Sequence, residues 1–191
     1  MIFRGSTSGE TSPEFEAALS SLTGFTTRAE IEIDEAPAPQ RLARFALALT
    51  ADAGGDEELG AGRLVVLHDP DGQPTWHGTF RIVAFVRATL EPELAADPML
   101  AEIGWTWLTE SLQRADADFS HIAGTVTRTT STSFGSMSDQ PTKGDIEIRA
   151  SWTATYPDLA PHARAWTDLL ATAVGLEPLA PGVVALPRRT R

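Results

Sequence analysis

The chain of 191 residues is 42% hydrophobic and 21% charged, which is typical of one globular domain and argues against global disorder. Its 26 acidic and 15 basic residues give a formal net charge of −11, so we expect no direct binding to nucleic acid or to anionic membranes. Cysteine is absent, which excludes disulfides and thiolate sites, and neither a signal peptide nor an apolar run of bilayer length is visible, so we expect a cytoplasmic protein.

The first part of the chain predicts a leader followed by a capped helix. Residues 1–11 are mostly small and polar, and we expect them to form a flexible leader. Ser12 and Pro13 then supply a helix N-cap and a proline at the first helical position. Gly24 ends the helix after a stripe of apolar residues at helical spacing, namely Phe15, Ala18, Leu19 and Leu22.

Alternating apolar residues then predict four strands. The first covers about residues 29–34 and the second residues 43–51, where a helix over much the same residues is the alternative because alanine and leucine favour helices. Two more strands, over residues 63–67 and 75–90, are joined by residues 68–72, whose Asp-Pro-Asp-Gly sequence is typical of a tight turn. On the last strand the residues expected to face the core are Phe80, Ile82, Ala84, Val86 and Ala88.

The second half of the chain predicts a helix, two threonine-rich strands and a final helix. The first helix covers about residues 98–114, and its expected core residues are Leu100, Ile103, Trp107 and Leu108. The strands cover about residues 120–134 and 143–155, the final helix residues 158–175, and a proline- and arginine-rich tail residues 179–191. On the last strand the expected inward residues are Ile146, Ile148, Ala150, Trp152 and Ala154.

These elements predict one α+β domain over residues 12–178, with the order α-β-β-β-β-α-β-β-α. Hairpin connections and two-residue alternation favour a single antiparallel sheet of about six strands. Because the strands are apolar on one side, we expect the three helices to pack mainly on that face.

A motif search excludes the familiar chemistries. The only lysine, Lys143, follows no phosphate-binding loop, and neither a serine nucleophile elbow nor a zinc helix of the His-Glu-x-x-His type is present. We therefore expect no cofactor and no metal site, and we favour a protein without enzymatic activity.

The histidines and tryptophans have structural interpretations. His68 and His77 flank the predicted hairpin, where we favour turn-capping roles over a metal pair, and His162 is expected to be a hydrogen-bonded core residue. Of the tryptophans, we expect Trp152 and Trp166 in the core and Trp76 and Trp105 partly exposed.

The candidate binding surface is the sheet face turned away from the helices. Its predicted site residues are Arg81, Phe85, Arg87, Arg128, Glu147 and Arg149. The structural interpretation is a set of cross-strand charge pairs, each contributing at most about 1 kcal/mol. The functional interpretation is a recognition surface, in which the arginines bind a carboxylate or phosphate beside Val83 and Phe85. Exposure of those two apolar residues suggests that something covers them.

Four segments carry a family resemblance: Arg63-Leu-Val-Val-Leu-His-Asp-Pro, Trp76-His-Gly-Thr-Phe-Arg-Ile-Val, Gly124-Thr-Val-Thr-Arg and Ile146-Glu-Ile-Arg-Ala-Ser-Trp. They resemble an actinobacterial family of uncharacterised proteins, number 3000 in the domain-of-unknown-function series. The similarity spans roughly residues 29–189 and implies no catalytic residue that can be carried over to this chain.

Three functions remain open from the sequence. We favour a non-enzymatic interaction module, adapter or chaperone-like, that binds a protein partner through the polar sheet face or an exposed strand edge. The alternative is a small-molecule (anion) binding protein or an enzyme of unfamiliar type, which uses the sheet-face arginines with His77 or His121 for proton transfer. A homodimer that hides Phe85 at its interface is the third.

Overall fold

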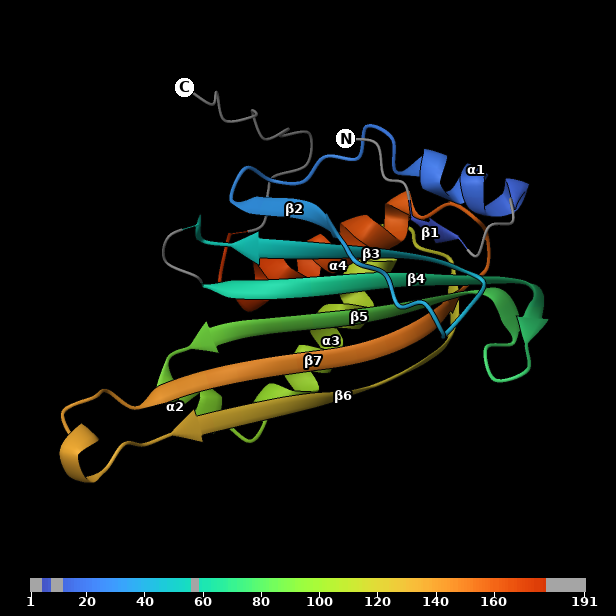
Figure 1. Cartoon of the computed structure of the whole chain (residues 1–191). Coiled ribbons are helices and arrows are strands. Elements are labelled where there is room, and N and C mark those ends of the chain that lie inside the picture. Colours follow the sequence, from blue (N-terminus) through green and yellow to red (C-terminus); the bar gives the residue numbers. More distant parts are fainter. Residues whose placement is uncertain (1–4, 8–11, 56–58, 178–191) are drawn as a thin grey trace, which may run out of the picture.

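One open antiparallel sheet with helices packed on one side forms the frame of the molecule (Figure 1). The structure is a computed structural model, and it describes residues 5–7, 12–55 and 59–177. The sheet order is β1-β3-β4-β5-β7-β6, and β2 pairs with β3 as well. The strands are β1 (Ser6–Thr7), β2 (Ile31–Ala36), β3 (Phe45–Ala53), β4 (Gly60–Gln73), β5 (Gly78–Leu90), β6 (Phe119–Ser131) and β7 (Lys143–Ala154).

Four α-helices complete the described part of the chain. They are α1 (Pro13–Ser21), α2 (Pro92–Ala96), α3 (Leu100–Arg114) and α4 (Ala160–Ala173), and a 3₁₀ turn, η2 (Gly135–Met137), lies between β6 and β7. The predicted α+β class with a single antiparallel sheet is confirmed, and the predicted order lacked only the short elements β1, α2 and η2. None of the described helices is long and apolar enough to span a membrane.

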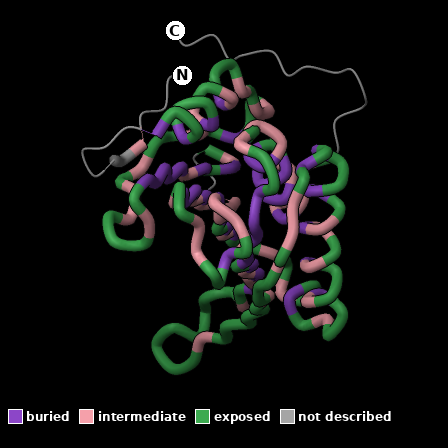
Figure 2. The backbone as a smooth tube through the Cα atoms, turned by 90° about the vertical axis from the view of Figure 1, so that its right-hand side faces the viewer, coloured by how far each residue is buried: buried purple, intermediate pink, exposed green. Residues whose placement is uncertain are grey.

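The core lies between the sheet and the helices, and its strand residues follow the alternation in the sequence (Figure 2). All five predicted inward residues of β5 and all five of β7 are buried. The second strand is confirmed as β3, and the alternative helix is wrong, because Phe45–Ala53 pairs with both β2 and β4. Burial of each large apolar side chain stabilises the fold by roughly 1.5–3 kcal/mol. A slip of one residue in a strand would turn all of these side chains into solvent, so the two-residue alternation determines which face of the sheet is buried and which stays exposed.

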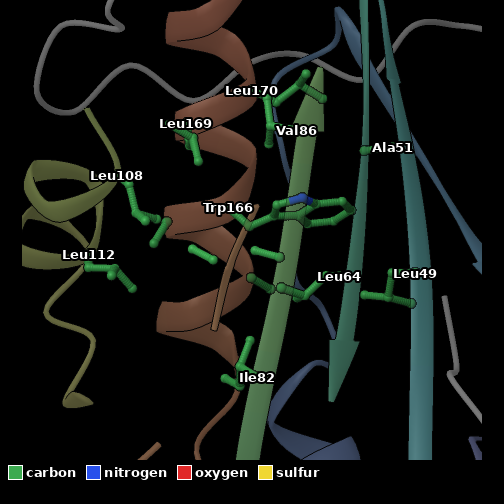
Figure 3. Packing of buried hydrophobic residues seen from close by; sticks show 14 of the residues in the cluster. Leu49, Ala51, Leu64, Ile82, Val86, Leu108, Leu112, Trp166, Leu169 and Leu170 are labelled. Atoms are coloured by element: carbon green, nitrogen blue, oxygen red, sulfur yellow. The ribbon is translucent and has the colours of Figure 1, made fainter. Parts of the chain in front are cut away.

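Trp166 of α4 packs against the middle of the sheet. Its indole lies against the strands near Ala51 and Leu64 (Figure 3), and Nε1 donates a hydrogen bond to the Phe85 carbonyl at 3.3 Å. Gly62 of β4 makes room for the ring, because a Cβ at that position would lie 2.9 Å from the indole Nε1. The glycine therefore allows α4 to pack closely on the sheet.

Helix α1 is joined to the sheet through its cap. The Ser12 hydroxyl oxygen accepts a hydrogen bond from the Phe15 amide at 3.3 Å, which confirms Ser12 as the N-cap. Its Oγ also lies 3.1 Å from Nε2 of buried His68, whose Nδ1 is 3.1 Å from the Thr79 carbonyl oxygen. Because a carbonyl only accepts, Nδ1 carries the proton and Nε2 accepts from the Ser12 hydroxyl. His68 is thus a buried link between α1, β4 and β5 and does not cap a turn.

The predicted hairpin turn is wrong in position. β4 continues past His68 to Gln73, with an irregular register between those two residues, and the chain reverses at residues 74–77. The Trp76 amide donates to the Gln73 carbonyl at 2.9 Å to close this turn. The new position moves Trp76 from the expected partly exposed edge into a buried site.

Helix α3 is rotated relative to the predicted stripe. Leu100 and Leu108 are buried as expected, but Ile103 is 38% exposed, and Gly104 faces the sheet instead. A Cβ at Gly104 would lie 2.9 Å from the Ile146 side chain, so the helix packs too closely for a large residue there. The buried stripe is therefore centred on a glycine, which a search for large apolar residues misses.

The whole of the predicted tail, and residues 1–4 and 8–11 of the predicted leader, lie outside the described residues. Within the predicted leader, Ser6–Thr7 forms β1 and pairs with Phe45 and Ala46 of β3.

Candidate functional site

The sheet face turned away from the helices carries charged, hydroxyl and apolar side chains in register. One row across three strands places Arg63 beside Phe85 and Phe85 beside Arg149. The neighbouring row on the same face consists of Val65, Val83 and Ser151. The face is therefore apolar at its centre, with an arginine on each side of Phe85.

The chain itself covers one part of this face. Residues 37–44, which we call the strap, connect β2 to β3 and cross in front of the sheet (Figure 1). Beneath the strap lies a second, smaller apolar cluster, separate from the main core, in which Ala46, Leu67 and Trp76 are buried. Side chains fasten the strap at both ends: Arg63 donates to the Pro37 carbonyl at 2.8 Å, and Gln73 donates to the Leu42 carbonyl at 3.2 Å.

Beyond the strap, the same face is hollowed into an open groove. A hollow of about 310 Å³ lies against the strap, and one of about 350 Å³ continues over β5 and β7. The two share Arg63, Val65 and Val83. Val83 is 39% exposed on the floor and Leu42 is 58% exposed on the strap. We define the groove by Leu42, Arg63, Val65, Val83, Phe85 and Arg149.

Arg149 covers one end of the groove. Its guanidinium carbon lies 4.8 Å from the centre of the Phe85 ring, in cation–π contact, and Nε donates to the Glu147 carboxylate at 2.6 Å. The hydrogen bond and charge of Glu147 raise the pKa of Arg149, so the side chain stays cationic. The predicted residues Phe85, Glu147 and Arg149 therefore lie together, as the alternation indicated.

Arg81 and Arg87 lie on the predicted face but bind within the protein. Arg81 donates to Ser151 Oγ at 2.6 Å and to Thr153 Oγ1 at 3.1 Å, and burial lowers the pKa of its guanidinium. Arg87 donates to the Asp145 carboxylate at 3.0 and 3.3 Å. Their hydrogen bonds to neighbouring strands are those of a charge and hydroxyl ladder, so these two arginines give no specific support to an anion clamp.

Arg128 does not belong to this face. It pairs in register with Ile146, whose side chain points into the core, and it donates to the carbonyls of Ala95 and Ala96 at 3.3 and 2.8 Å. The guanidinium thus binds the carboxyl end of α2, on the helix side of the sheet. Its inclusion among the predicted site residues is a misplacement, and Thr125, Thr127 and Thr129 are the outward residues of β6.

The histidines lie in different pairs from those that the sequence suggested. His68 is buried, and it does not form the metal-binding pair with His77 that the sequence left open. The His77 ring instead stacks on the ring of His121, with centroids 4.2 Å apart. His162 is confirmed as a core residue, and its Nδ1 accepts a hydrogen bond from Trp152 Nε1 at 3.1 Å. Within the described parts of the chain, no group of three or more metal-binding side chains comes together.

Sequence reasoning missed Arg63 and Leu42 as groove residues. Arg63 alternates with inward Leu64 and so could have been assigned to the outward face by the same rule as Arg81. Leu42 follows two prolines that end the preceding strand, and no local pattern indicates that this segment crosses the sheet.

Comparison with known proteins identifies a family and nothing more detailed. No curated protein and no solved structure matches the chain. The model of one family, described as a protein of unknown function (DUF3000), matches residues 11–184, which include every element of the sheet except β1. This chain therefore belongs to the DUF3000 family.

Proposed function

We propose that this chain is a cytoplasmic, non-enzymatic interaction module that binds an extended segment of a partner protein in the groove. The observation that carries the proposal is Val83, which is 39% exposed at the centre of β5, between Ile82 and Ala84, which are buried on the opposite face. Covering such a side chain stabilises a complex by roughly 25 cal/mol for each Å² of apolar surface removed from water. The absence of cysteine fits a reducing compartment.

The way the strap covers part of this face supports the proposal that the ligand is an extended segment. It is itself a proline-containing connection, and it buries Ala46, Leu67 and Trp76 on the same face that the groove leaves open. A partner segment laid beside the strap would extend this cover over Val83 and Phe85. Because the floor is preformed by three strands, little ordering of this chain is required on binding.

The charges favour a segment that combines apolar and acidic residues. Arg63 and Arg149 lie on either side of Phe85, in a protein whose formal net charge is −11. A carboxylate of the partner could exchange with Glu147 on Arg149, and a charge-assisted pair of this kind fixes the register of a bound segment. A strongly basic segment would meet two cations at the groove.

Site-specific photocrosslinking in the native cell tests this proposal. We expect Val83→p-benzoylphenylalanine to form an adduct with a second protein, and we expect a further Leu42→Asp substitution to reduce that adduct roughly tenfold or more, because a charge is placed at the apolar contact. The matched control is Thr127→Asp, since Thr127 is exposed on the same face outside the groove.

Two kinds of result contradict the proposal. One is an adduct of twice the mass of the chain, which shows that a second copy covers Val83 and establishes the homodimer. The other is an adduct that Leu42→Asp and Thr127→Asp reduce equally, or no adduct at all.

A further inference from the structure

Two histidines that the groove does not use face each other at the hairpin end of the sheet. His77 lies in the β4–β5 turn and His121 in β6, and their rings stack with centroids 4.2 Å apart and planes 13° apart. Both side chains are exposed, so neither ring is held in place by close packing. The stacking must therefore come from the backbone that carries them.

Both histidines have a left-handed backbone. Their φ angles are +56° and +50°, and Asp116 is the one other described residue besides glycine with a positive φ. Such a conformation costs about 1 kcal/mol or more for a residue with a Cβ and persists where surrounding contacts impose it. At His121 the imposing feature is a β-bulge, because the register of β6 against β7 shifts between Ser120 and Ala123. A bulge of this kind redirects a side chain from its normal alternation.

One hydrogen-bond network holds both strained segments. Arg81 Nη1 donates to the His121 carbonyl at 3.0 Å and to Thr153 Oγ1 at 3.1 Å. The Thr153 hydroxyl in turn donates to the carbonyl of Trp76, the residue before His77. A single arginine and a single threonine thus fix the positions from which the two imidazoles project.

Imidazole nitrogen is a good ligand for zinc, copper and nickel ions. The Nδ1 atom of His121 lies 3.0 Å from Ser120 Oγ, which can accept a hydrogen bond from Nδ1–H and leave Nε2 as the ligating atom. Two nitrogens bound tetrahedrally at about 2.0–2.1 Å from a zinc ion lie roughly 3.3 Å apart. Rings stacked 4.2 Å apart with planes 13° apart do not direct their nitrogen lone pairs to one point, so binding one ion requires each exposed ring to rotate out of the stack about its side-chain torsions.

We propose that His77 and His121 form a two-histidine binding site for a divalent transition metal ion. No third His, Asp or Glu of the described chain joins them, so water or a donor atom of another molecule fills the remaining positions. Such a site binds metal exchangeably and leaves coordination positions open. It shares no residue with the groove, and it does not depend on the proposed interaction function.

A zinc titration of the full chain tests the site. We expect one zinc ion per chain at pH 7.5, measured by calorimetry and by shifts of two histidine side-chain NMR signals. His77→Asn and His121→Asn should each weaken binding at least tenfold, and asparagine is chosen because it tolerates a left-handed backbone. The control is Asp71→Asn, which removes an exposed carboxylate from the same hairpin and should leave the affinity unchanged. Thermal unfolding should show that zinc stabilises the wild type and not the two histidine variants.

Zinc affinities of the two histidine variants within twofold of the wild type would overturn the proposal, because the ion would then be held by surface carboxylates. Stoichiometric binding that shifts the signals of other histidines alone would overturn it as well.

Discussion

Burial of the His162 imidazole lowers its pKa from 6.5 to about 4, although Asp158 and Asp118 act in the opposite direction. The ring is held neutral because Nδ1 accepts the Trp152 indole N–H in the core. Between pH 6.5 and pH 4 the unfolded chain therefore binds a proton that the folded chain does not, and stability must fall as the pH falls through that window. His68 acts in the same direction, since burial lowers its pKa too.

The His162→Asn variant isolates this effect. Asparagine keeps an oxygen acceptor near the position of Nδ1 and removes the titration. We expect wild-type unfolding free energy to fall by about 3 kcal/mol more than that of the variant between pH 7 and pH 4, as urea denaturation at each pH would measure. Equal pH dependence in the two proteins would show that His162 is protonated in the folded state.

At the scale of elements, the two-residue alternation predicted the strands well, because the residues that face the core are apolar and most of those that face away from it are polar. All ten inward residues assigned on β5 and β7 are buried. Of the residues that alternate with them on β7, from Asp145 to Thr153, only Thr153 is buried, and its hydroxyl binds the Trp76 carbonyl of the hairpin. One error arises where the backbone departs from a regular period, since β4 continues through an irregular register past His68. Arg128 is a different case, because it alternates with Thr127 and Thr129 and regular alternation therefore places it on the helix side, where it faces α2.

Contacts between elements could not be predicted from local sequence patterns. The strap and the His77–His121 stack join residues that are distant in the sequence, and neither has a periodic signal. Trp105 was expected to be partly exposed, and it is, but its ring packs on Gly124 of β6. The sequence signal for that contact is a glycine within a strand, which indicates that another group packs closely there but does not identify which residue it is.

Gly124 provides a test of this helix–strand contact. A Cβ there would lie 2.3 Å from the Arg149 carbonyl oxygen and 2.9 Å from the Trp105 ring. Because the first of these is backbone of the neighbouring strand, Gly124→Ala should force β6 away from β7 and lower the unfolding free energy by about 1–3 kcal/mol. Thr127→Ala, at an exposed position of the same strand, should change it by less than about 0.5 kcal/mol.

The Trp105→Ala background distinguishes the two contacts. If the backbone clash dominates, removing the indole does not rescue Gly124→Ala, and chemical denaturation shows the same loss in both backgrounds. Full rescue would instead assign the role of Gly124 to the tryptophan alone.

On the scale of the whole molecule, the sheet separates two unequal apolar layers. The main core contains buried residues of α1, α3 and α4 and of β2, β3, β4, β5 and β7, with partly buried residues of β6 packed against it, whereas the cluster beneath the strap contains three buried residues. A small cluster on an otherwise solvated face would be the first to open if it were independent. Hydrogen bonds join this cluster to the sheet, so it is not independent: the Thr153 hydroxyl donates to the Trp76 carbonyl, and the Gln73 side chain donates to the Leu42 carbonyl of the strap.

We therefore expect the two layers to unfold together, as one domain over residues 12–178. The tryptophans report on both layers, since Trp76 lies beneath the strap while Trp152 and Trp166 lie in the main core. In protein labelled with 5-fluorotryptophan, all native fluorine NMR signals should disappear at one urea concentration, coincident with the loss of far-ultraviolet circular dichroism. Earlier loss of the Trp76 signal would show that the strap opens separately, and would make the groove side of the sheet a local unfolding unit whose cover a partner segment could replace.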